Sequence, residues 1–143
     1  MKRNLMTGIL TILALLLLIS VPSSYAQTAV RATVPFNFTV GKAEMPAGTY
    51  TVSRVSSSVI EIRDSTTKKS MVSLVWSEGD SSSDSTAKLV FNRYGDRYCL
   101  SQVSRGDGTN VLRLPASKRE QEQRFASTSG ASEQKVVAAR LQK

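Results

Sequence analysis

The chain has 143 residues, an aromatic fraction of 6% and a formal net charge of +8 from 19 Lys and Arg against 11 Asp and Glu. It contains no His and a single Cys, which excludes His-assisted serine or cysteine hydrolysis, zinc sites built on imidazole and an internal disulfide. A chain of this length has room for one domain with a single hydrophobic core.

The first 26 residues have the three parts of a signal peptide. Positive charge at positions 2 and 3 precedes an almost wholly apolar run over residues 5–21, and the small residues Ser24 and Ala26 suit signal peptidase. Residues 1–26 are therefore predicted to be an N-terminal signal helix that is cleaved before Gln27. An uncleaved membrane anchor is the alternative interpretation of the same apolar run.

The predicted location is the periplasm or the extracellular space, with no stable membrane span after signal cleavage. Export also separates a basic chain from nucleic acid, so nucleic acid is not expected as a partner. The positive charge of an exported chain could instead serve to bind an anionic envelope polymer, a lipid headgroup or an acidic glycan. The simpler interpretation of the same charge is a solvated basic surface with no binding role.

Residues 27–116 carry the pattern of a β domain. Residues 30–40 alternate apolar and polar side chains, the strongest strand signal in the chain, and Pro35 marks an edge or a bulge within it because it lacks a backbone N–H. Further strands are predicted over residues 49–55, 59–63, 71–76, 88–94, 97–103 and 111–115. About seven short strands separated by turn residues predict an all-β fold, either a single antiparallel β-sandwich or a small barrel.

A two-residue turn at Gly95 and Asp96 predicts a type II′ hairpin. Its register sets three facing pairs: Tyr94 with Arg97, Phe91 with Leu100, and Leu89 with Gln102. The predicted core contains Phe36, Phe38, Tyr50, Val52, Leu74, Phe91, Leu100 and Leu112. Cys99 is expected to fill the core rather than to react, and an intermolecular disulfide stays open.

The C-terminal part is predicted to be a helix followed by a tail. Ser117 and Glu120 match a capping box, which predicts a short helix over residues 117–126. Residues 127–143 are predicted to form a basic flexible tail, weakly helical over residues 133–141, that folding does not need and that attracts anionic surfaces.

Four short strings in the chain occur together in a recognisable order: VPFNFTVG at 34–41, MPAGTYTV at 45–52, YGDRY at 94–98 and LPAS at 114–117. In this order the chain resembles a family of small exported β-rich proteins of acidobacterial type. The resemblance implies an exported β fold and no activity, cofactor or catalytic residue. Cys99, where an aromatic residue is more usual, and Met45, in place of Leu, depart from the pattern as core substitutions.

No catalytic, cofactor-binding or metal-binding residues are predicted. Five acids offer the carboxylate pairs that glycosidases use, although a solvated surface explains them as well: Glu44, Glu61, Asp64, Glu78 and Asp96. The acidic loop 78–84 offers oxygen ligands for calcium through Glu78, Asp80 and Asp84 but lacks EF-hand spacing.

Three further segments match the consensus sequence of a known functional motif, and each match has a structural interpretation. Residues 65–68 spell Ser-x-x-Lys, yet the enzymes that use this motif place its serine at a helix start in a far larger domain. Residues 105–107 spell Arg-Gly-Asp in a turn, and residues 37–39 spell a glycosylation sequon inside a strand. None of the three predicts a function here.

The sequence therefore predicts an exported, non-enzymatic envelope or secreted β domain that binds a protein, a glycan or an anionic envelope polymer, without a cofactor. The alternative is a small β-barrel that carries a hydrophobic ligand, and the third reading is a carboxylate-dependent hydrolase. A pocket lined by Tyr, Phe and Trp76 favours the carrier, acids converging in a cleft favour the hydrolase, and an exposed apolar or basic face favours the binding module.

Overall fold

A computed structural model describes residues 29–79, 86–106, 111–126 and 133–142. The predicted signal peptide, residues 1–26, lies outside these ranges. Within the described residues, no helix has the length and apolar character needed to cross a bilayer.

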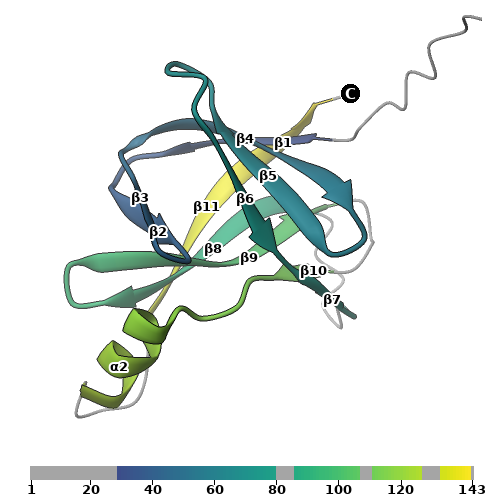
Figure 1. Cartoon of the computed structure of the whole chain (residues 1–143). Coiled ribbons are helices and arrows are strands. Elements are labelled where there is room, and N and C mark those ends of the chain that lie inside the picture. The colour runs from purple at the N-terminus through teal and green to yellow at the C-terminus, as the bar shows by residue number, and fades with distance from the viewer. Residues whose placement is uncertain (1–28, 80–85, 107–110, 127–132, 143) are drawn as a thin grey trace, which may run out of the picture.

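The described residues form eleven strands and one helix (Figure 1). The strands are β1 (Ala29–Val34), β2 (Phe38–Val40), β3 (Ala43–Met45), β4 (Gly48–Ser56), β5 (Val59–Asp64), β6 (Ser70–Leu74), β7 (Trp76–Glu78), β8 (Ala87–Tyr94), β9 (Arg97–Arg105), β10 (Val111–Arg113) and β11 (Glu133–Gln142). The helix, α2 (Lys118–Ala126), matches the predicted short helix.

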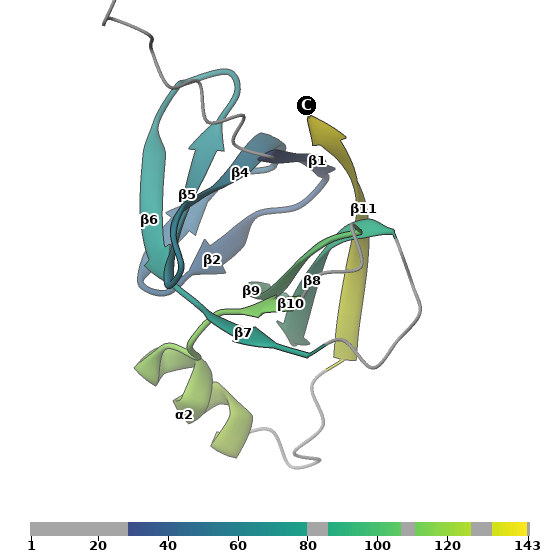
Figure 2. The ribbon, with the colours of Figure 1, turned by 90° about the vertical axis from the view of Figure 1, so that its right-hand side faces the viewer.

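These strands make one sheet with the order β3-β2-β9-β8-β11-β1-β4-β5-β6, and β10 joins β9 to β7. The pairing of β2 with β9 is parallel, and the other pairings of the described strands are antiparallel. The sheet curls into a half-barrel, with β4, β5 and β6 facing β8, β9 and β10 across the interior (Figure 2). The all-β prediction is confirmed.

The predicted number of about seven strands is wrong, and strand breaks explain part of the difference. The predicted strand over residues 30–40 ends at Val34 and resumes at Phe38, so that β1 pairs with β4 and β11 while β2 pairs with β3 and β9. Pro35 lies in this break, where the chain crosses from one part of the curl to the other and no ladder hydrogen bond is needed from its nitrogen. The predicted strand over residues 71–76 likewise breaks at Val75 into β6 and β7.

Aromatic side chains fill the interior of the curl. The rings of Phe38 and Tyr50 meet edge to face at 5.1 Å between centroids, and those of Phe38 and Phe91 at 5.2 Å. Seven of the eight predicted core side chains lie in or against this core, but Leu74 is 66% exposed and Val75 is buried instead. Apolar residues occupy both positions, so the sequence alternation did not distinguish which one faces inward.

The β8–β9 hairpin matches the predicted turn and most of the predicted register. Gly95 has a φ of 61°, as the first central position of a type II′ turn requires. Tyr94 faces Arg97 and Phe91 faces Leu100, but Leu89 faces Val103 rather than Gln102 because a bulge follows Val90. The bulge turns Val103 into the core, where it is 1% exposed.

Helix α2 is anchored to the sheet through one acid. Its N-terminus is capped by Ser117, whose Oγ accepts a hydrogen bond of 3.1 Å from the Glu120 backbone N–H, as the capping box predicts. The Glu120 carboxylate is buried and accepts hydrogen bonds from Asn92 Nδ2 at 3.2 Å and Tyr94 Oη at 3.3 Å. This acid therefore ties the helix to the outer face of β8.

The prediction of a flexible, weakly helical tail over residues 127–143 is wrong for its described part. Residues Glu133–Gln142 form β11, which pairs along one edge with β1 and along the other with β8 (Figure 2). Val137 and Ala139 pack against the core, whereas the outward Val136 is 54% exposed. The sequence gives this segment good helix formers and few apolar residues, but backbone pairing on both edges overrides that local preference.

We predict that a protein of residues 27–126 loses its cooperative unfolding transition, because β1 and β8 each lose the strand that joins them. As point controls, Val137→Thr should lower the free energy of unfolding by about 1–2 kcal/mol, and Val136→Thr should change it by less than about 0.5 kcal/mol. Urea denaturation of the three variants and the parent measures this. An unchanged transition in the shortened protein would contradict the role of β11.

Candidate functional site

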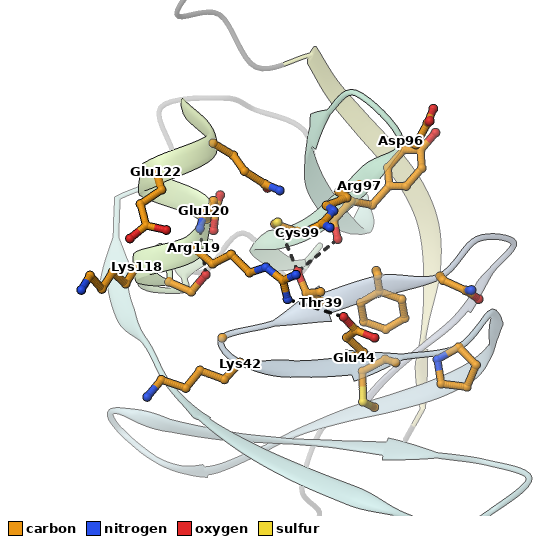
Figure 3. Close-up of a pocket in the computed structure, with 18 residues that line it drawn as sticks. Thr39, Lys42, Glu44, Asp96, Arg97, Cys99, Lys118, Arg119, Glu120 and Glu122 are labelled. Carbon is orange, nitrogen blue, oxygen red and sulfur yellow. Dashed lines mark hydrogen bonds and ion pairs between the residues drawn. The ribbon is translucent and has the colours of Figure 1, made fainter. Parts of the chain in front are cut away.

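A groove of about 830 Å³ opens between three segments of the described chain (Figure 3). One wall is the β2–β3 hairpin with its flanks, residues 37–46, and a second is the β8–β9 turn with the start of β9, residues 96–99. The third wall is the first half of α2 with its cap, residues 117–123. The groove thus joins parts of the chain that are far apart in sequence.

Local hydrogen bonds hold the hairpin wall in place. Gly41 has a φ of 60° in the tight turn between β2 and β3. The Ala47 N–H donates to Asn37 Oδ1 at 2.9 Å, and the Tyr50 hydroxyl donates to the Pro46 carbonyl at 2.6 Å. The segment that follows β3 is therefore fixed both to the start of the hairpin and to the core.

The floor of the groove is apolar. Phe38 and Met45 reach it from the core, and Tyr98 reaches it from β9. The Tyr98 ring is already engaged, because it stacks on Phe36 with 4.0 Å between centroids and the Arg93 guanidinium lies 5.7 Å from its centroid. The groove therefore offers apolar contact area rather than an open aromatic platform.

The rim of the groove carries charges of both signs. Four cations and three acids lie along it: Lys42, Arg97, Lys118 and Arg119, with Glu44, Asp96 and Glu122. The fourth acid of the lining, Glu120, is buried and bound to Asn92 and Tyr94. Arg119 on α2 reaches across toward the β2–β3 hairpin, with its Nη1 3.7 Å from Glu44 Oε1 (Figure 3). Both side chains are more than half exposed, so this pair contributes little to stability and can open.

Cys99 lines the groove as a buried thiol. Its Sγ accepts a hydrogen bond of 3.2 Å from Thr39 Oγ1. Burial raises the pKa of the thiol, and the Thr39 hydrogen bond opposes this only in part. The thiolate that a nucleophile needs is therefore disfavoured, and the thiol is buried as predicted, although Cys99 is not among the side chains of the core cluster.

Of the five acids predicted as possible catalytic pairs, the structure brings only Glu44 and Asp96 to this groove. Glu61 pairs with Arg63 at 2.8 Å, and Glu78 pairs with Arg113. Hydrogen bonding to Arg63 and Ser70 lowers the pKa of Glu61, which is the wrong direction for a general acid.

Sequence reasoning missed Glu120, Glu122 and the cations of α2 as groove residues. The capping box placed the helix correctly, but no sequence signal showed which face of the sheet the helix would cover. Asn92 and Tyr94 donate hydrogen bonds to Glu120. Their role as the attachment point of α2 could not be predicted without knowing which face of β8 they lie on.

The remaining sequence motifs gain no functional support. Ser65 lies in the turn between β5 and β6 and does not begin a helix, as the Ser-x-x-Lys enzymes require. Lys68 Nζ donates to the Ser65 backbone carbonyl at 2.8 Å. Two of the three predicted calcium ligands, Asp80 and Asp84, lie outside the described residues, as does Asp107 of the Arg-Gly-Asp string. Within the described residues, no group of three or more acids or Cys is placed to hold a metal ion.

Asp64 has a structural role at the turn between β5 and β6. Its Oδ1 accepts the Thr66 N–H at 2.7 Å, and its Oδ2 accepts the Thr67 hydroxyl at 2.8 Å. These hydrogen bonds hold the pKa of this buried carboxyl below its ordinary value of 3.8. The turn also places Lys68 at a φ of 61°, so the carboxylate organises a strained connection.

We predict that Asp64→Asn lowers stability at pH 7 and that the deficit shrinks in acid. Because the folded pKa is lowered, the stabilisation by Asp64 is complete above the ordinary value of 3.8 and is lost as pH falls below it through the folded pKa. Urea denaturation of both proteins between pH 7 and pH 2 measures the difference. A difference that does not vary with pH over this range would show that the carboxylate charge is irrelevant to the turn.

Comparison with protein-family models, with curated proteins and with solved structures finds no match for this chain. The likeness of its motifs to an exported β-rich family stays a prediction. The chemistry of the groove is therefore the basis for a functional proposal.

Proposed function

We propose that this protein is an exported, non-enzymatic β domain that binds an extended segment of a partner protein in the groove between the β2–β3 hairpin, β9 and α2. The observation that carries the proposal is the combination of an apolar floor with a rim of four cations and three acids. Protein interfaces combine these features, with an apolar centre and a polar rim.

The presence of both signs of charge on the rim favours a protein segment over the other predicted partners. An anionic envelope polymer would meet Glu44, Asp96 and Glu122 as well as the cations of the rim. A glycan is usually held on an exposed aromatic face, and Tyr98 is already stacked on Phe36. A peptide with apolar side chains flanked by both signs of charge suits this groove best.

The hairpin wall adds a second argument. Within the described residues, β3 pairs only with β2, so its other edge carries backbone groups without a strand partner. Its Glu44 and Met45 line the groove. An extended peptide that lies along β3 gains main-chain hydrogen bonds from this edge and side-chain contacts from the floor.

The two alternative functions receive less support. A carrier of a hydrophobic ligand needs an apolar interior space, whereas Phe38, Tyr50 and Phe91 pack against one another inside the curl. Trp76, expected to line such a pocket, is 50% exposed on the outer surface. A hydrolase needs a free carboxylate pair, and Glu44 faces Arg119 instead.

The binding proposal is tested by photo-crosslinking in the cells that produce the protein. A photoreactive residue is placed at Lys42 or at Lys118, on opposite rims of the groove, and at Ser57 as a control in the exposed turn between β4 and β5. Both rim positions should yield the same discrete protein adduct, and Ser57 should not. The absence of an adduct from both rims, or an identical adduct from Ser57, would overturn the proposal.

Export is tested independently by N-terminal sequencing of the protein recovered from the envelope or the culture fluid. The signal peptide prediction expects Gln27 as the first residue. Recovery of protein that begins only at Met1 would contradict cleavage.

A further inference from the structure

Two arginines face each other across the seam that attaches the C-terminal strand. In the antiparallel pairing of β1 with β11, Arg31 is directly opposite Arg140. Directly opposed residues of an antiparallel pair have Cβ atoms about 4.5–5.5 Å apart, and like charges at such positions are destabilising. The arrangement therefore puts two positive charges where a sheet normally avoids them.

Nothing in the described protein neutralises this pair. Both side chains are exposed on the outer face of the curl, because Val30 and Ala32 of β1 and Ala139 of β11 point inward. The residues around the pair on that face are uncharged: Thr51 opposite Arg31 on β4, Thr33, Ala138 and Gln142. The next charged residues on this face, Arg63 opposite Thr51 and Lys88 opposite Ala138, are themselves basic, and Arg63 pairs with Glu61.

The two arginines also line a recess rather than a flat surface. A hollow of about 660 Å³ lies over the β1–β11 seam, and small side chains such as Thr33 and Ala138 leave space beside Arg31 and Arg140. Guanidinium groups bind oxyanions through paired, charge-assisted hydrogen bonds, which suit phosphate geometry well. Two of them at adjacent strand positions can share one doubly charged anion.

We propose that Arg31 and Arg140 form a binding site for a phosphate-type oxyanion across the β1–β11 seam. This site lies outside the groove of the proposed function and does not depend on it. The anion bridges the two guanidinium groups and removes the repulsion between them. Since Arg140 stands opposite Arg31 only when β11 is paired with β1, the anion binds the folded chain and stabilises the attachment of β11.

The test compares the thermal stability of the mature protein in inorganic pyrophosphate with that in sodium chloride of the same ionic strength. The parent protein should melt at a higher temperature in pyrophosphate. In sodium chloride, Arg140→Gln should melt at a higher temperature than the parent, because the repulsion between the two arginines is gone. Its affinity for pyrophosphate should fall by about tenfold or more, because a charge-assisted contact is lost. Arg31→Gln should behave in the same way and serves as the second variant.

Lys135→Gln is the matched control, since it removes one positive charge from β11 at a position that faces Phe91 of β8 rather than Arg31. It should keep the full response to pyrophosphate. An equal response in the parent and in both arginine variants, no response in the parent, or a loss of stability in chloride on removing either arginine would overturn the proposal.

A second arm identifies the source of the phosphate group. Vesicles of phosphatidylglycerol and phosphatidylcholine are added in place of pyrophosphate. Binding that depends on Arg140 but not on Lys135 assigns the site to lipid headgroups, and a response confined to pyrophosphate assigns it to soluble phosphate compounds. Vesicle binding that both variants retain reflects the net basic charge and counts against a headgroup at this site.

Discussion

The two sides of the curled sheet meet through one strand that comes last in the chain. Strand β11 pairs with β1 along one edge and with β8 along the other, and no pairing of β1 with β8 is present among the described strands. An unpaired strand edge exposes backbone donors and acceptors, so an unoccupied gap here would leave two edges open in the middle of the sheet. The attachment of residues 133–142 is thus a condition for the curvature of the sheet seen in Figure 2.

The candidate groove depends indirectly on the attachment of β11, through β8. Strand β8, which β11 holds, pairs with β9, and β9 supplies Tyr98 and Cys99 to the groove. The outer face of β8 also carries Asn92 and Tyr94, which bind Glu120 and so position α2. A groove assembled from three distant segments keeps its shape only while the strand that supports two of them stays in place.

Local sequence signals predicted the parts of the fold that local chemistry determines. The Gly95 turn and the Ser117 cap were predicted correctly, and the alternation over residues 30–40 predicted the strands Ala29–Val34 and Phe38–Val40 but joined them into one. Turn geometry, helix capping and strand periodicity are short-range effects, which is why these signals could be used. The register error at Leu89 came from a bulge that has no sequence signature beyond the polar Ser101, whose hydroxyl donates to the Val90 carbonyl at 3.0 Å.

The features that depend on pairing between distant segments could not be predicted from local sequence patterns. In β11, only Val137 and Ala139 pack against the core, so its apolar pattern is too sparse to mark a strand, and its Ala, Glu and Lys content favours a helix. Its stability comes from hydrogen bonds to β1 and β8, whose availability depends on the whole topology. The opposition of Arg31 and Arg140 and the assembly of the groove follow from the same pairing, so neither could be read from the sequence.

Native-state amide hydrogen exchange of the mature protein tests the central role of β11 most directly. If β11 joins the two sides of the sheet, its amide protons exchange only through global unfolding, with the same protection as those of β4 and β9. The account predicts one cooperative unit that includes Glu133–Gln142. Exchange of the β11 amides that is orders of magnitude faster, while β1 and β8 keep full protection, would contradict it.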